Sequence, residues 1–201
     1  TSGNYTDAGS GIASNVITRS NGQAPAAGVC PGSGYSGSTV VTSPDSTVAD
    51  GQCYVYTLTG TDNVGNVSTV SSSPVMVDTT APADAITLNT PSNAYKSGTT
   101  VYYRGSVAGS FKLQDAVSDG TSGPASSTFG ALSGGSGFGT HNSERISTPA
   151  GGPYRSSSIT WGSGSSGAPT IPVTGKDAAG NSPAATTLTL SLDNTAPASG
   201  S

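Results

Sequence analysis

Charge is the scarcest property of this 201-residue chain. Only 9% of its residues are charged, and seven Lys and Arg stand against 11 Asp and Glu, which gives a net charge of −4. Proteins that bind nucleic acid need clustered Lys and Arg to neutralise phosphates. Here the basic residues are scattered, and Lys96 is the first lysine. The composition therefore argues against a nucleic-acid partner.

Long apolar runs and catalytic residue types are also scarce. No stretch approaches the roughly 20 apolar residues of a membrane-spanning helix, so we expect no membrane insertion. The only histidine, His141, lies in a Gly/Ser-rich stretch near Glu144, where we expect it to be exposed to solvent. One His and two Cys are too few ligands for a zinc site, and a single Glu in a thin fold offers no obvious glycosidase cleft. We therefore expect no enzyme activity and no catalytic residues.

Hydrophobic residues are sparse as well, at 32%, while Gly, Ser and Thr dominate. Disordered chains share this low hydrophobicity, but they usually carry high charge. This chain instead shows period-2 alternation: Tyr54, Tyr56 and Leu58 share one face of a predicted strand. The pattern predicts an all-β fold with strands near 12–19, 54–60, 85–88, 99–103, 110–114, 127–132 and 157–161, and with long loops at 133–142 and 162–167.

What the sequence does contain is a motif that occurs twice. Gly60–Asn66 reads Gly-Thr-Asp-Asn-Val-Gly-Asn and is followed at 77–82 by Val-Asp-Thr-Thr-Ala-Pro; the matching segments begin at Gly175 and Leu192, 115 residues later. Asp7–Gly11 matches Asp119–Gly123 with an offset of 112. A fixed period of this size marks tandem structural units. We expect a first unit at 1–80 that lacks its first strands, a complete unit at 81–197, and the start of a next repeat at 198–201.

Each copy of the motif predicts a closing hairpin. In Asp-x-x-Gly-Asn the glycine can take positive φ, and the Asp and Asn side chains bond back to the backbone, so the motif predicts a turn between two strands. The return strand is expected at 73–77 in the first copy and at 188–192 in the second. About seven short strands in about 110 residues, separated by turn signals, are typical of an antiparallel β-sandwich.

These residues resemble a known family. Gly-x-Asp-x-x-Gly-Asn followed by Asp-Thr-Thr-Ala-Pro is similar to the tandem bacterial Ig-like (Big-type) repeat domains of extracellular adhesins and surface proteins, most clearly over 54–88 and 170–197. The resemblance implies tandem immunoglobulin-like β-sandwiches outside the cell. It also implies a stalk or spacer role, with cell adhesion as a further role, in which the partners are neighbouring Ig-like repeats of the same chain.

The Ig-like topology gathers the N-terminal linker, the B–C loop and the F–G loop at one pole. For the second unit this predicts a group of four aspartates, which are Asp78, Asp115, Asp119 and Asp177. Asp7 and Asp62 are the equivalents in the first unit, whose linker partner is missing, and Asp193 would serve the next unit. Calcium takes six to eight oxygen ligands, and the resemblance agrees with calcium at such junctions. The alternative is that each Asp only caps a turn and that no cofactor is bound.

The two cysteines, Cys30 and Cys53, both lie in the first unit, and Ala168 stands at the position that matches Cys53. Two cysteines in one thin-cored unit predict a disulfide and an oxidising compartment. The alternative is a pair of free thiols.

Two other functions stay open. One is a subunit or decoration of an extracellular filament or virus-like particle, in which an identical neighbouring chain completes the first unit. The other is a carbohydrate-binding or spacer module of a secreted hydrolase, which would bind host or cell-surface glycans through an aromatic platform. The candidate platform residues are Tyr95, Tyr102, Tyr103, Tyr154 and Trp161, although Trp161 ends a predicted strand and is expected to pack in the core.

Overall fold

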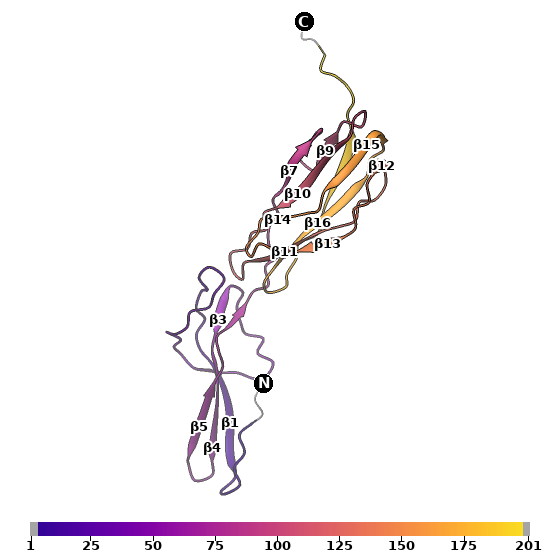
Figure 1. Cartoon of the computed structure of the whole chain (residues 1–201). Coiled ribbons are helices and arrows are strands. Elements are labelled where there is room, and N and C mark those ends of the chain that lie inside the picture. Colours follow the sequence, from indigo (N-terminus) through magenta and orange to yellow (C-terminus); the bar gives the residue numbers. More distant parts are fainter. Residues whose placement is uncertain (1–3, 199–201) are drawn as a thin grey trace. The chain divides into compact units, whose positions relative to one another are not determined.

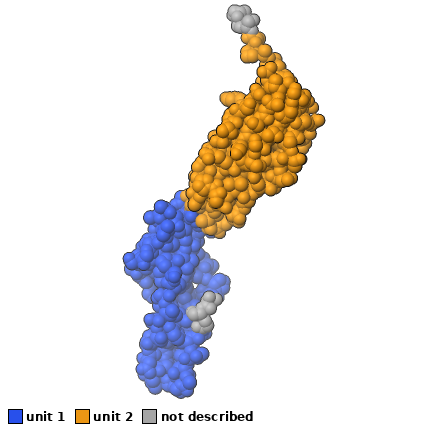
Figure 2. All heavy atoms as spheres, viewed as in Figure 1, with its two compact units in different colours: residues 1–80, 120–122 blue, residues 81–119, 123–201 orange. Residues whose placement is uncertain are grey.

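The computed structural model describes residues 4–198, and all the regular elements among them are β-strands, as predicted. The chain divides into two compact units, which are described one at a time (Figure 2). Unit 1 comprises Thr1–Thr80 with Gly120–Ser122, and unit 2 comprises Ala81–Asp119 with Gly123–Ser201. Of the expected start of a next repeat, only Ala198 lies within the described residues.

Unit 2 is a sandwich of two sheets (Figure 1). The six-stranded sheet has the order β13 (Glu144–Ile146), β11 (Pro124–Phe129), β16 (Thr170–Asp177), β17 (Thr186–Leu192), β9 (Thr100–Tyr103) and β8 (Ala94–Ser97). The five-stranded sheet has the order β12 (Ser136–Phe138), β15 (Ile159–Ser166), β10 (Gly109–Asp115) and β14 (Tyr154–Arg155), with β7 (Ile86–Ser92) also paired to β10. All strand pairs are antiparallel except β17 with β9.

The core of unit 2 lies between these sheets. In β16, Ile171 and Val173 are fully buried, whereas Pro172 and Lys176 are exposed, which is the alternation expected of a strand with one face on a core. The five-stranded sheet supplies Phe111, Leu113, Tyr154, Ile159 and Trp161 to the same cluster.

Unit 1 is built from a four-stranded sheet and a two-stranded sheet. The four-stranded sheet has the order β2 (Thr39–Val40), β1 (Ile12–Arg19), β4 (Tyr56–Asp62) and β5 (Val67–Ser71); the two-stranded sheet pairs β3 (Gln52–Tyr54) with β6 (Val75–Val77). Among the described residues of this unit the buried hydrophobic side chains are Cys53, Tyr54 and Leu58. Unit 1 therefore has a much smaller core than unit 2.

The two units contain the same strand pair in the same register. Ile17 lies opposite Leu58 on β1 and β4, and Phe129 lies opposite Val173 on β11 and β16. Each pair has a β-bulge at the matching place, after Ile12 in unit 1 and after Pro124 in unit 2. The sequence repeat is therefore also a repeat of backbone structure.

Candidate functional site

Asp177 organises the turn that follows β16. Its Oδ1 accepts the backbone N–H groups of Gly180 and Asn181 at 2.6 and 2.7 Å, and its Oδ2 accepts the Asn181 side-chain amide at 2.9 Å. Gly180 has φ of 105°, a conformation that L side chains rarely adopt. The motif residues Asp, Gly and Asn are therefore each required by the turn itself.

Asp62 makes the same turn in unit 1. Its carboxylate accepts the backbone N–H groups of Val64 and Asn66 at 3.0 and 2.8 Å and the Asn66 side-chain amide at 2.7 Å. The Asn66 side chain and the backbone donors stabilise the ionised form, so the pKa of Asp62 lies below its usual value of 3.8.

A second loop carries Asp119 in unit 2 and Asp7 in unit 1. Asp119 accepts the N–H of Gly123 at 2.9 Å, and Asp7 accepts the N–H of Gly11 at 2.8 Å. The Gly123 carbonyl in turn accepts the N–H of Ala178 at 2.9 Å, which ties this loop to the Asp177 turn. As a result, carboxylate oxygens of Asp119 and Asp177 lie within 4.8 Å of each other in unit 2.

The linker aspartates also form turns. Asp78 accepts the N–H of Thr80 at 3.1 Å, and Asp193 accepts the N–H of Thr195 at 3.0 Å. Asp78 belongs to unit 1, whereas Asp119 and Asp177 belong to unit 2.

Asp115, in contrast, points into the interior of unit 2. It is fully buried, and its Oδ2 accepts the Ser127 hydroxyl at 2.7 Å. Burial and the neighbouring Asp84 carboxylate raise the pKa of Asp115, against the effect of the Ser127 hydrogen bond. Asp84 accepts the N–H of Gly175 at 3.0 Å, and Gly175 lies opposite Ser127 in the β11/β16 pair. Asp115 is thus a fully buried acid beside a half-buried one, Asp84.

Sequence reasoning missed Asp84, which carries no repeat or motif signal. Its Oδ1 is buried without a hydrogen-bond partner, and burial raises its pKa. Both acids reach from the side of the five-stranded sheet to β11 and β16 of the six-stranded sheet, so they join the two layers of unit 2.

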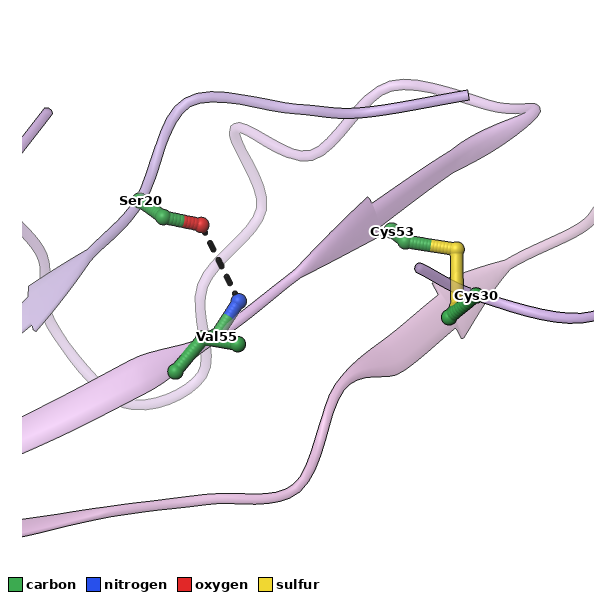
Figure 3. Close-up of a disulfide and its surroundings, with 4 residues drawn as sticks. All are labelled: Ser20, Cys30, Cys53 and Val55. Carbon is green, nitrogen blue, oxygen red and sulfur yellow. Dashed lines mark hydrogen bonds between the residues drawn. A yellow bond between two sulfur atoms is a disulfide. The ribbon is translucent and has the colours of Figure 1, made fainter. Parts of the chain in front are cut away.

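The predicted disulfide between Cys30 and Cys53 is present, with a Cα–Cα distance of 5.7 Å (Figure 3). Next to it, Ser20 extends the β1/β4 ladder: its Oγ accepts the Val55 N–H at 3.0 Å and its own N–H donates to the Val55 carbonyl at 2.9 Å. A disulfide fits an oxidising compartment.

The candidate aromatic platform is divided by the fold. Trp161 is 3% exposed, as expected of a core residue, and its indole N–H donates to backbone carbonyls of the β9–β10 connection. Tyr103 and Tyr154 are also buried. Only Tyr95 and Tyr102, at 69% and 40% exposed, remain accessible, and they lie opposite each other on β8 and β9.

His141 is buried rather than exposed, so that expectation was wrong. Its Nε2 lies 3.2 Å from a Glu144 carboxylate oxygen, and the same oxygen accepts the N–H of Ser157. The segment folds inward because the Leu132 N–H donates to the His141 carbonyl, which holds the chain against the end of β11.

Among residues 4–198 no helix is long and apolar enough to cross a membrane. No protein family, curated protein or solved structure matches this chain.

Proposed function

We propose that this chain is a structural repeat module of an extracellular bacterial surface protein, built from tandem immunoglobulin-like sandwiches and acting as a stalk or spacer. The observation that carries the proposal is the repeated β1/β4 and β11/β16 pair, with its shared register, bulge and aspartate turns. Arrays of such units extend by addition, because each unit contacts mainly its neighbours. The Cys30–Cys53 disulfide supports a location outside the reducing cytosol.

A scattering experiment tests whether these units form an extended stalk. Proteins with one, two and three tandem copies of residues 81–197 are compared by small-angle X-ray scattering. A stalk predicts a maximum dimension that grows by the same increment with each copy. A dimension that stays nearly constant would mean that the copies collapse on one another, which contradicts the proposal.

We also propose that calcium binds in unit 2 where Asp119 and Asp177 approach each other. Two carboxylates supply oxygen ligands of the hard type that calcium prefers, and carbonyls and water can complete the shell. The repeat pattern in the sequence makes Asp7 and Asp62 the equivalent pair of unit 1, and the role of Asp78 as a ligand stays a prediction from the sequence. Asp115 is left out because its carboxylate bonds inside the sandwich. When bound, the ion would neutralise the two like charges and hold both loops.

Carbohydrate binding is a second candidate, favoured by the exposed pair Tyr95 and Tyr102. Aromatic rings on neighbouring strands present apolar faces at low conformational cost. A glycan array compares the wild-type protein with the Tyr95→Ala/Tyr102→Ala variant, and the exposed Leu192→Ala variant serves as control. Binding that is lost only in the tyrosine variant supports this candidate, and an array without any bound glycan removes it.

A further inference from the structure

The four-stranded sheet of unit 1 has an apolar face without a second sheet. Ile17 and Leu58 stand where unit 2 has Phe129 and Val173, as the shared register shows. Phe129 and Val173 are fully buried in a cluster that includes side chains of the five-stranded sheet. The described residues of unit 1 form no counterpart of that sheet.

A hollow of about 500 Å³ lies on this face of unit 1. Its apolar lining includes Ile17, Val41, Tyr56, Leu58 and Val70. The volume falls in the range of about 300–1,000 Å³ that is usual for binding pockets. Unit 1 therefore has apolar surface and room for additional side chains.

One border of the hollow is an unprotected sheet edge. β5 pairs with β4 alone among the described strands; all its residues are exposed, and it contains neither a charge nor a proline. The edge strands of unit 2 include β8 with Lys96, β13 with Arg145 and β7 with Pro91. Charges and prolines of this kind block pairing with another chain, and β5 lacks them.

Unit 2 shows which strand lies beside the corresponding edge of its own sheet. β17 follows β16 in an antiparallel hairpin as β5 follows β4. Only the end of β17, Thr189–Leu192, pairs with β9; by the 115-residue offset these residues match 74–77 of unit 1, the stretch after β5 that contains β6 (Val75–Val77). The alternate residues Val101 and Tyr103 of β9 are almost completely buried. Arg104 follows directly. In unit 2 the strand at this edge is therefore an extended one with apolar side chains at alternate positions.

The net charge of unit 1 indicates whether a second copy of unit 1 or a different partner occupies the hollow. Unit 1 has one cation, Arg19, which lies 3.1 Å from Asp45 and is therefore already paired. Two such units repel each other, whereas a strand with a basic residue is attracted. The aspartates of unit 1 responsible for this are Asp7, Asp45, Asp50, Asp62 and Asp78.

We propose that unit 1 binds, from another polypeptide, an extended basic strand with apolar residues at alternate positions, the pattern of β9 and Arg104. The strand adds through main-chain hydrogen bonds to the edge that runs from the end of β5 into β6, and its alternate side chains enter the hollow over Leu58 and Ile17. Strand addition of this kind takes affinity from the backbone and specificity from the side-chain pockets.

The test uses a labelled synthetic peptide with the sequence of residues 98–106, titrated with the 201-residue protein and followed by fluorescence anisotropy. Saturable binding is expected. A peptide with Val101→Ser and Tyr103→Ser should lose at least about tenfold in affinity, while a Tyr102→Ser peptide, changed at the outward position, should bind like the original. Absence of saturable binding, or equal affinity of all three peptides, overturns the proposal.

Protein variants locate the site. Val70→Lys places a charge on β5 and should weaken binding of the original peptide about tenfold. Val64→Lys, at an exposed turn position before β5, is the matched control and should leave binding unchanged; circular dichroism checks that both variants fold. Equal effects of the two variants overturn the placement on β5. Sedimentation that shows dimers abolished by Val70→Lys, without peptide binding, would mean that a second copy is the occupant.

Discussion

The carboxylates of Asp119 and Asp177 lie within 4.8 Å of each other in unit 2. Like charges at about 4 Å repel by about 1 kcal/mol in water and by more where the effective dielectric constant is lower. Asp177 is only 1% exposed, so water screens it poorly. Backbone N–H donors of its turn offset part of this repulsion, and a bound cation would offset more.

We therefore predict that calcium stabilises unit 2. An ion that binds only the folded state adds about 2.7 kcal/mol when present at 100 times its dissociation constant. The chain has one tryptophan, Trp161, which is buried in the core of unit 2 and reports that unit specifically. Thermal unfolding followed by Trp161 fluorescence should show a higher midpoint in calcium than in excess EGTA.

Two substitutions separate a calcium site from turn formation. Asp119→Asn keeps an oxygen that can accept the Gly123 N–H but removes a charge, and it should abolish most of the calcium response. Asp193→Asn makes the same change in an exposed linker turn and should leave the response intact. Identical midpoints in calcium and EGTA for the wild-type protein would leave the aspartates with their turn roles alone.

The half-buried Asp84 and the fully buried Asp115 predict an unusual pH dependence of unit 2. Burial raises the pKa of both acids above 3.8, and the neighbouring Asp84 carboxylate raises the pKa of Asp115 further. The folded state therefore holds protons that the unfolded state releases, so this contribution to stability is complete below about pH 3.8. It declines as pH rises through the folded pKa values, by about 1.4 kcal/mol for each unit by which a pKa is raised.

Guanidinium unfolding, followed by Trp161 fluorescence at several pH values above 3.5, measures this effect. Asp84→Asn keeps an acceptor for the Gly175 N–H and removes one of the two charges. We predict that it raises the free energy of unfolding at pH 7 and flattens the pH dependence, whereas Asp193→Asn does neither. A wild-type unit 2 that becomes steadily more stable from pH 4 to 7 would contradict this account.

The disulfide should stabilise unit 1 and not unit 2. Closing the loop between Cys30 and Cys53 is worth about 3 kcal/mol in the chain-entropy description. Cys30→Ala with Cys53→Ala should therefore lower the hydrogen-exchange protection of β1 and β4, while the Trp161-reported transition stays in place. A shift of the Trp161 transition as large as the loss in unit 1 would be evidence against this local effect.

Strands with clear alternation were the easiest part of the fold to predict. The strand predicted at 12–19 is β1, Ile12–Arg19, and the turn at Asp62 joins β4 and β5. The return strand expected at 73–77 was wrong as the partner of β4, because 75–77 is β6 and pairs with β3. Turn chemistry and period-2 burial are local properties, so the sequence contains them directly. The disulfide was predictable for a similar reason, because the chain has only two cysteines.

Other features depend on contacts between distant segments and left no local signal. The stretches 133–142 and 162–167 were expected to be loops, but Ser136 pairs with Ser166 in β12 and β15. A Cβ on Gly137 would lie 2.3 Å from the Ser165 hydroxyl, so glycine permits the close approach of these strands. Glycine gives no alternation of polarity, and the strands were therefore missed. The proximity of Asp84 and Asp115 was also missed, because it depends on contacts with two other strands, β11 and β16.

Unequal cores predict unequal resistance to proteolysis. Unit 1 buries few hydrophobic side chains, namely Cys53, Tyr54 and Leu58, whereas unit 2 buries a continuous cluster from two sheets. Local opening costs less where few apolar contacts are broken, so brief digestion with a nonspecific protease should cut within residues 4–80 first. Mass spectrometry should then find a lasting fragment that spans residues 84–193. Equal survival of both units, or first cuts inside unit 2, would contradict this prediction.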